Sequence, residues 1–323
     1  MNIHVLVLEG VFDTGLAAVL DALSMANQLA GMAGLPAAPF QVKLVGVRAT
    51  VKTAQGLAVP VAPIPRRGAP DLVVVPAIAF MSAEPLRQAL ARPATVEAMA
   101  ALRTYVQRGA GLATACIGTF VLAEAGLLDD HEATTTWWLA PFFRHRYPGV
   151  RLDESRMIIE SGRITTAGAA LGHVDLALWI IRRQSPSLAA LAARYLILDA
   201  RPSQSAYALV EHMAHSDPLV ERFERWARSA LARGFSLDEA AAAAATSKRT
   251  LARHLREVLG RSPLAYFQDL RVERAVHLLK TTAQTVEEVA GQVGYADGVT
   301  LRSLLRRRLG SGVKAIRGHG RDG

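Results

Sequence analysis

The chain has 323 residues, of which 51% are hydrophobic, so it is long enough for two domains that each bury a core. Its one cysteine, Cys116, excludes an intramolecular disulfide and is typical of a protein of the reducing cytoplasm. The first residues, MNIHVLVLEG, have no basic region, so we expect no signal peptide. No apolar run approaches the roughly 20 residues that span a bilayer, so we expect no membrane partner.

Apolar runs alternate with helical patterns in the first part of the chain. Strands are expected at 3–8, 40–47, 71–76, 111–116 and 133–136, with a hairpin near 161–162. Helices are expected at 14–32, 93–108, 118–125, 137–147, 168–183 and 185–200. This alternation predicts an α/β domain with a doubly wound, mostly parallel sheet over residues 1–198. Such sheets bind ligands outside the carboxyl ends of their strands.

Cys116 stands between a predicted strand and a predicted helix. A side chain at such an elbow faces the ligand edge of the sheet, and the amide donors of the helix lower the pKa of a thiol. The position suits a cysteine nucleophile, and it also suits the floor of a pocket without chemistry. The candidate ligand-binding residues are Asp13, Cys116, Ile117, Thr136 and Trp137. Asp13 follows the first strand, where it has an alternative interpretation as the N-cap of the next helix.

Residues 199–217 are expected to form a linker, and residues 218–318 a second, basic domain. From Ser216 onward there are 19 Lys or Arg against 12 Asp or Glu, out of a net charge of +9 for the whole chain. This excess indicates a nucleic-acid partner. The same part of the chain contains an internal duplication: an S/T-x-x-E capping box, a short helix, a break and an Arg-rich helix occur twice.

A short helix, a turn and a basic second helix predict a helix-turn-helix, whose second helix enters the major groove of DNA. Two matched copies favour this interpretation over a merely solvated basic face. The candidate DNA-binding residues are Lys248, Arg249, Thr250, Arg253 and His254 in the first copy and Thr300, Arg302, Ser303 and Arg306 in the second. The sequence therefore predicts an all-α domain with two recognition helices.

This region resembles the DNA-binding domain of the AraC/XylS family of transcription regulators. The resemblance rests on FSLDEAAAAAATSKRTLARHLREVLGRSPLAYFQDLRVERAVHLL and TVEEVAGQVGYADGVTLRSLLRRRLG, and it implies two helix-turn-helix units joined by a long helix near 263–279. The second copy departs from the family pattern at Leu301, where an aromatic residue is usual. It departs again at 312–316, where the family has a Ser-Pro-x-x-Tyr/Arg tail.

The first domain resembles the PfpI-type branch of the class I glutamine-amidotransferase-like superfamily, which has a flavodoxin-like fold. The matching stretches are PDLVVVP, GAGLATACIGTFVLAEAGLLDDHEATTTWW and TAGAALGHVDLALWII. Catalytic relatives have a His just before the Trp, where this chain has Thr136, and a neutral Thr cannot act as the base that a cysteine nucleophile needs. His131 and His173 are the nearby alternatives in the sequence. In this order the two domains resemble the GlxA-like type of AraC regulator.

These features predict a DNA-binding transcription regulator, controlled by a small-molecule effector that binds in a non-catalytic first domain. The alternatives are a cysteine-dependent hydrolase or hydratase fused to a DNA-binding domain, and an architectural DNA-bending protein without a ligand. We expect no catalytic residues, no cofactor and no metal. The expected partners are double-stranded DNA, the effector, a second copy of the chain and RNA polymerase.

Overall fold

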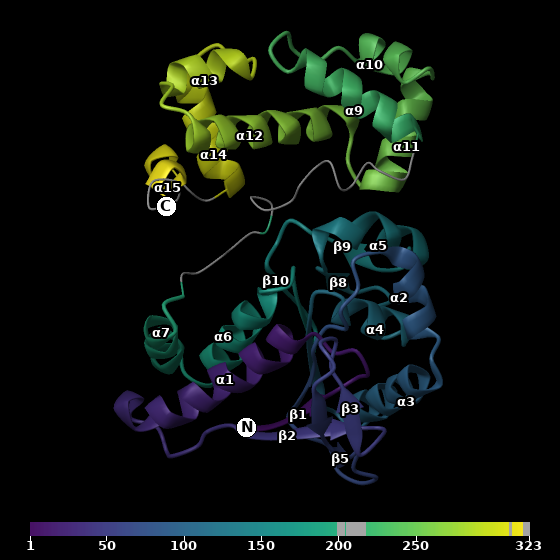
Figure 1. Cartoon of the computed structure of the whole chain (residues 1–323), viewed down its shortest axis with the longest axis vertical. Helices are drawn as coiled ribbons and strands as arrows, with labels where there is room; N and C mark the ends of the chain where they lie inside the picture. Colours follow the sequence, from purple (N-terminus) through teal and green to yellow (C-terminus); the bar gives the residue numbers. More distant parts are fainter. Residues whose placement is uncertain (199–203, 205–217, 310–311, 319–323) are drawn as a thin grey trace. The chain divides into compact units, whose positions relative to one another are not determined.

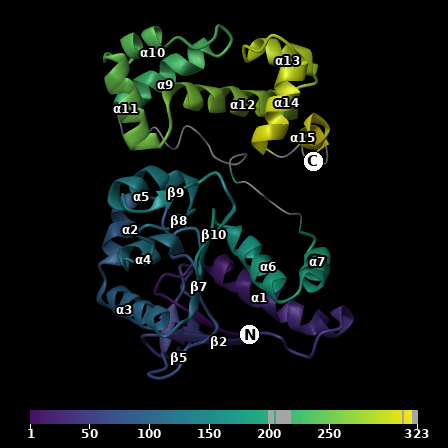
Figure 2. The ribbon, with the colours of Figure 1, turned by 180° about the vertical axis from the view of Figure 1, so that it is seen from behind.

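The computed structural model describes residues 1–198, 204, 218–309 and 312–318 (Figures 1 and 2). The chain divides into two compact units, Met1–Gln204 and Ser205–Gly323, and each is described by itself. The division falls within residues 199–217, the predicted linker. Of that segment only Gln204 belongs to the described residues.

The first unit is built on a seven-stranded sheet in the order β10-β11-β7-β6-β1-β2-β5. All neighbouring strands are parallel except β10 and β11, which form the predicted hairpin. The strands are β1 (Asn2–Leu6), β2 (Gln41–Gly46), β5 (Ala62–Pro63), β6 (Leu72–Val75), β7 (Gly111–Ala115), β10 (Ile158–Ser161) and β11 (Ile164–Ala167). Because β2 and β6 lie on opposite sides of β1, the chain changes direction there, and ligands bind near such a point at the carboxyl ends of the strands.

Helices cover both faces of this sheet, which confirms the predicted doubly wound α/β fold. One face carries α1 (Asp13–Leu29), α6 (Gly172–Gln184) and α7 (Pro186–Tyr195) (Figures 1 and 2). The other carries α2 (Ala83–Leu90), α3 (Pro93–Gln107), α4 (Gly118–Glu124) and α5 (Ala140–Arg146). Successive side chains of a strand point to opposite faces. Accordingly, Leu72 and Val74 pack in the first core, and Val73 and Val75 pack in the second.

The remaining elements of the first unit are short. They are β3 (Thr50–Lys52), β4 (Ala58–Pro60), β8 (Glu132–Ala133), β9 (Arg151–Leu152) and the 3-10 helices η1 (Ala30–Ala33) and η2 (Trp137–Leu139).

The predicted strand at 133–136 is wrong beyond Ala133. There the backbone N–H of Thr134 donates to the side chain of Thr166 (2.8 Å), so a side chain replaces a strand partner. Helix α6 begins four residues later than predicted, and α2, β3, β4 and β5 were not predicted.

The segment Asp13–Ala33 is, by length and composition alone, apolar enough to cross a membrane. The expectation that no apolar run approaches that length therefore fails for this segment. Its apolar side is occupied, because Leu16, Val19 and Leu23 are buried in the core shared with α6, α7 and the sheet. We therefore assign α1 to the core of the α/β unit.

His173, near the start of α6, is a buried structural residue. Its Nε2 accepts a hydrogen bond from the Ala77 N–H (3.0 Å), and its Nδ1 donates to the Ala170 carbonyl (2.6 Å). A Cβ at Gly15 would lie 2.8 Å from the imidazole ring, so α1 can pack here only because that residue is glycine. Burial lowers the pKa of His173 to about 4, and the ring is therefore neutral at pH 7.

The second unit is entirely helical in its described residues and confirms the predicted domain with two helix-turn-helix units. Its helices are α9 (Pro218–Ala230), α10 (Leu237–Ala243), α11 (Lys248–Leu259), α12 (Pro263–Thr281), α13 (Val286–Gln292), α14 (Gly298–Leu309) and α15 (Val313–Gly318). The long helix α12 contributes to two cores (Figure 1). Tyr266, Phe267 and Leu270 pack with α9, α10 and α11, whereas Ala275 and Leu279 pack with α13, α14 and α15.

Arg271, in the middle of α12, connects the two cores. Its Nε and Nη2 atoms donate to the Leu231 carbonyl just after α9 (3.0 and 2.8 Å). Its guanidinium also lies over two rings, 4.9 Å from the centroid of Phe267 and 5.1 Å from that of Tyr295. Gly294 makes this arrangement possible, because its φ is +78° and a Cβ there would overlap both the guanidinium and the Leu231 carbonyl.

We predict that Gly294→Ala destabilises the second unit by at least about 2 kcal/mol, since it adds both backbone strain and overlap with Arg271. Calorimetric melting of the full chain measures the effect. Gly291→Ala is the matched control: that glycine lies in α13 with open space around it, so the change should be neutral or stabilising by up to about 1 kcal/mol. Equal melting of the two variants would contradict the role given to Gly294.

We predict that the first unit loses stability as the pH falls. The pKa of His173 is about 4 in the folded chain and 6.5 in the unfolded chain, so below pH 6.5 the unfolded chain binds the additional proton. Between pH 7 and 4 the wild type should lose about 3 kcal/mol more than His173→Gln, which keeps a donor and an acceptor without titrating. Urea unfolding at several pH values measures this difference, and parallel pH profiles for the two proteins would contradict it.

Candidate nucleic-acid interface and candidate ligand site

The first recognition helix, α11, begins at a side-chain cap and packs by a single apolar stripe. Ser247 accepts a hydrogen bond from the Thr250 N–H (3.1 Å) at its N-terminus. Leu251, Leu255 and Leu259 are fully buried against α9 and α10. Helix α10 begins at Ser236, which accepts from the Glu239 N–H (3.3 Å). The predicted capping box is therefore only half formed there, because no return bond from the Glu239 side chain is present.

The second recognition helix, α14, is built in the same way. Asp297 accepts a hydrogen bond from the Thr300 N–H (2.7 Å) before its first turn. Leu301 and Leu305 are fully buried, so the departure from an aromatic residue at Leu301 leaves the packing intact. Helix α13, which supports α14, begins with a complete capping box between Thr285 and Glu288.

Most of the predicted DNA-binding side chains lie on the exposed faces of these two helices. Thr250 and His254 are half-buried, and the Thr250 hydroxyl accepts a hydrogen bond from Ser247 (2.9 Å), which gives Thr250 a role in the helix cap. The exposed members of the predicted set are Lys248, Arg249, Arg253, Thr300, Arg302, Ser303 and Arg306. Arg302, Ser303 and Arg306, together with Val299 and Arg307, line a surface hollow of about 470 Å³.

Three of these cations have acidic neighbours. Lys248 pairs with Asp238 (2.7 Å), Arg253 with Glu257 (3.6 Å) and Arg302 with Glu287 (2.9 Å). All six side chains are about half exposed or more, and such surface pairs contribute only about 0–1 kcal/mol. A DNA phosphate can therefore replace these partners at small cost.

The elbow at Cys116 has the expected backbone geometry but not the expected thiol. Cys116 has a φ of +55°, its N–H donates to the Ala167 carbonyl (2.9 Å), and its side chain is 4% exposed. Burial raises the pKa of the Cys116 thiol to about 12, although the Ile117 N–H and the Thr136 hydroxyl favour the thiolate. The expected lowering of this pKa is therefore wrong, because loss of solvent outweighs the helix donors. The thiol is neutral at pH 7.

Several buried polar atoms near this edge have no hydrogen-bond partner in the described residues. The Thr136 hydroxyl lies close to the thiol, yet it makes no hydrogen bond of normal geometry. The Nε1 of Trp138 is also buried without a hydrogen-bond partner in the described residues. The Trp138 ring packs edge-on against the Trp137 ring, with centroids 5.4 Å apart. Trp138 was not among the predicted site residues. Such buried, unsatisfied groups are costly unless water or a ligand binds them.

Asp13 also lies at the carboxyl edge, after β1. It is the first residue of α1 rather than its N-cap, which is Phe12, so the capping interpretation is wrong. One carboxylate oxygen accepts from the Gln55 N–H (3.1 Å), and the other is buried without a hydrogen-bond partner in the described residues. Ile117 is buried at the start of α4 and contributes its backbone N–H and an apolar surface.

Neither nearby histidine is placed to act as a base for Cys116. Both ring nitrogens of His173 bind backbone groups, and the ring is neutral. His131 instead binds the Ser161 hydroxyl through Nδ1 (2.9 Å), beside the β10–β11 hairpin. The part of the chain that the structure describes also holds no cluster of three His, Cys, Asp or Glu side chains suited to a metal.

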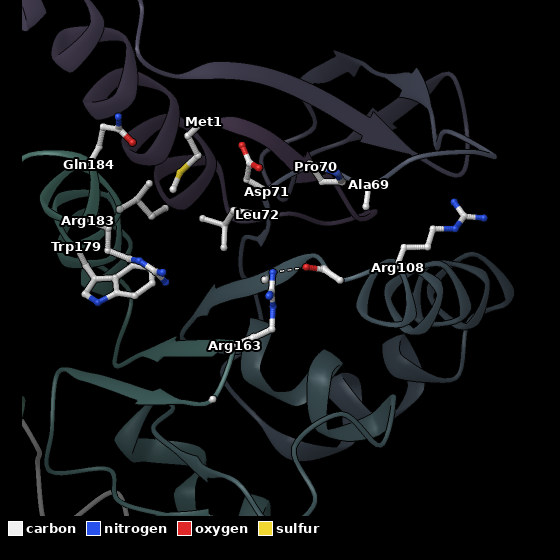
Figure 3. A pocket seen from close by; sticks show the side chains of 14 residues that line it. Met1, Ala69, Pro70, Asp71, Leu72, Arg108, Arg163, Trp179, Arg183 and Gln184 are labelled. Carbon is white, nitrogen blue, oxygen red and sulfur yellow. Dashed lines mark hydrogen bonds between the residues drawn. The ribbon is translucent and has the colours of Figure 1, made fainter. Parts of the chain in front are cut away.

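A separate cavity of about 670 Å³ lies at the opposite, amino edge of the sheet (Figure 3). Arg163 binds the Gly109 carbonyl there, and the Arg183 guanidinium lies 5.1 Å from the ring centroid of Trp179. Arg108 and Asp71 also line it. With three guanidinium groups and one carboxylate, this cavity suits an anion. It is distinct from the carboxyl edge that the sequence indicates.

Known proteins resemble both the helical domain and the α/β unit of this chain. Residues 240–318 match the family described as a helix-turn-helix domain. The HTH-type transcriptional regulator GbdR of Pseudomonas aeruginosa is 27% identical over 223 residues, which cover 68% of this chain and 60% of GbdR. The HTH-type transcriptional regulator GlxA of Rhizobium meliloti is 24% identical over 210 residues, or 64% of each chain. The chain thus spans about 60% of the length of GbdR.

A solved structure shares the fold of the first part of the chain. It is a protein from Vibrio parahaemolyticus described as a candidate transcriptional regulator, with a TM-score of 0.51 and 19% identity over 61% of this chain and 98% of that one. The mostly parallel sheet and the strand-to-helix elbow at Cys116 agree with the predicted α/β fold of this unit. The chain therefore has a helix-turn-helix domain at residues 240–318 and an N-terminal unit that shares the fold of that solved structure.

Proposed function

We propose that this chain is a cytoplasmic transcription regulator that binds double-stranded DNA through α11 and α14 and responds to a small molecule held by its α/β unit. The observation that carries the proposal is the pair of exposed, Arg-bearing helices on capped and well-packed supports. The related proteins named as HTH-type transcriptional regulators support it. Two copies of the chain on one operator, and contact with RNA polymerase, belong to the same proposal.

The proposed effector site lies at the carboxyl edge, where Asp13, Cys116, Ile117, Thr136 and Trp137 are placed. The unsatisfied carboxylate oxygen of Asp13 and hydroxyl of Thr136 supply an acceptor and a group that can donate or accept. The indole of Trp137 is 9% exposed and supplies an apolar wall. This combination favours a small polar ligand with at least one hydrogen-bond donor.

We propose further that the α/β unit does not catalyse a reaction. A cysteine nucleophile needs a base or a lowered thiol pKa. Cys116 has a raised pKa, and both candidate histidines are held by other groups. The neutral thiol is then one more wall of the effector site.

The DNA contacts are tested by Arg249→Ala in α11 and Arg306→Ala in α14. On a duplex selected by the wild-type chain, each change should cost about 1–3 kcal/mol if the arginine contacts a base, and specificity should relax at that position. If it contacts phosphate, affinity should fall for all sequences and the salt slope should decrease by about one. Fluorescence anisotropy titrations at several salt concentrations distinguish these results.

Arg225→Ala is the matched control for both variants. Arg225 is an exposed arginine of α9 whose side chain is paired with Glu221, outside both recognition helices. It should keep the wild-type affinity and salt slope. An equal loss in all three variants would mean that affinity depends on overall charge and not on the two helices.

The effector site is tested by Thr136→Val, which removes the unpartnered hydroxyl at nearly constant volume. A metabolite panel screened by thermal shift against the wild type supplies the ligand. We expect the variant to bind it at least about fivefold more weakly, because the ligand loses a buried hydrogen bond of about 1–3 kcal/mol. Isothermal titration calorimetry measures the change.

Arg163→Ala, in the cavity at the amino edge, is the control for this experiment. It should bind the same ligand with wild-type affinity. If Arg163→Ala loses the ligand and Thr136→Val keeps it, the effector occupies the Arg-lined cavity of Figure 3, and the proposed site is wrong.

A further inference from the structure

Gln204 is a fully buried side chain that neither the DNA contacts nor the proposed effector contacts use. It belongs to the segment between α7 and α9, within the predicted linker. Its side-chain oxygen accepts from the Ala169 N–H (2.9 Å), and its side-chain amide donates to the Thr135 carbonyl (2.8 Å) and the Thr134 hydroxyl (3.2 Å). Its own N–H donates to the Ser155 carbonyl (3.1 Å). Both polar groups of the side chain are therefore satisfied inside the α/β unit.

The α/β unit has a space shaped for this side chain. A Cβ at Gly168, directly after β11, would lie 2.5 Å from Nε2 and 2.7 Å from Oε1 of Gln204. No other residue type at Gly168 would leave room for the amide in this position. A polar side chain held this closely keeps its bonds only while Thr134, Thr135 and Ala169 keep their positions.

The contacts of Gln204 lead directly to the proposed effector site. Thr135, whose carbonyl binds Gln204, donates its hydroxyl to the Cys116 carbonyl (2.7 Å). The next residue, Thr136, carries the unpartnered hydroxyl beside the thiol. Two hydrogen bonds thus connect the linker residue to the residue at the strand-to-helix elbow.

We propose that Gln204 is a positioning residue that couples the effector site to the linker that leads to the DNA-binding unit. This inference rests on the proposed function. While Gln204 is bound, only residues 205–217 remain between the two units' described parts. Without these bonds, the last described residue of the α/β unit is Leu198, six positions earlier, and six residues of extended chain span roughly 20 Å. A ligand that moves Thr135 or Thr136 therefore changes whether the chain is held to the α/β unit at Gln204.

Coupling between two sites is reciprocal, so DNA must act on the effector site as well. Cys116 is the only cysteine of the chain, and its rate of alkylation by iodoacetamide therefore reports on this site alone. We expect a selected DNA duplex to raise this rate at least threefold in the wild type. The proposed coupling means that binding to DNA and the state without the Gln204 bonds favour each other.

Gln204→Ala should react fast with or without DNA. Gln204→Glu keeps the size of the side chain and an acceptor for the Ala169 N–H, but its carboxylate cannot donate to the Thr135 carbonyl, so it should behave in the same way. Gln88→Ala is the matched control, because Gln88 is exposed on α2 and binds only Glu84 among the described residues. It should show the wild-type dependence on DNA.

A gel shift on the same samples distinguishes failure of the proposed DNA binding from failure of the proposed coupling through Gln204. If the wild type binds no duplex, the proposed function fails and the coupling fails with it. If it binds DNA but the Cys116 rate does not change, or rises equally in wild type and Gln204→Ala, the coupling alone is overturned. A DNA-dependent rise in wild type and Gln88→Ala only is the supporting result.

Discussion

The bonding of Arg271 is the interaction on which the proposed DNA-binding surface depends. One guanidinium binds the carbonyl that follows the first helix of the domain and lies between an aromatic ring of α12 and the ring of Tyr295. Each helix-turn-helix motif has its own core. Helix α12 and Arg271 therefore determine how the two helix-turn-helix motifs are held together. Gly294 is required because the guanidinium and the Leu231 carbonyl occupy the space of a side chain. The spacing of the recognition helices thus depends on a polar contact as well as on apolar packing.

The α/β unit has the backbone of a nucleophile elbow at Cys116 but not the lowered thiol pKa that a nucleophile needs. Cys116 has a left-handed backbone conformation, but burial keeps its thiol neutral, and the neighbouring Thr136 cannot act as a base. What remains is an edge with unpartnered polar atoms and an aromatic wall. These features are the basis of the proposed effector site. The hydrogen bonds of Gln204 to the same stretch are the basis of the proposed coupling between this edge and the chain that leads to the second unit.

The sequence predicted the elements whose signals are local. The apolar run of β6, the glycine-bounded helix α11 and the two Arg-bearing helices were found because periodicity and caps lie within a few residues. Short elements such as α2 and β5 lack such a signal. The bonds of Gln204, the roles of His173 and Gly15, and the raised pKa of Cys116 arise from contacts across the fold, which no local pattern contains. Arg271 lies within the first stretch that carries the family resemblance, but its contacts with Leu231, Phe267 and Tyr295 arise from the fold.

Dimethyl sulfate protection on a selected duplex tests the central claim most directly, because the reagent reads the guanine N7 atoms that face the major groove. Two recognition helices in successive grooves predict two protected clusters about 10 base pairs apart. The Arg249→Ala change in α11 should erase one cluster, and the Arg306→Ala change in α14 should erase the other. A single protected cluster, or one cluster lost with either arginine, would contradict a surface made of two recognition helices.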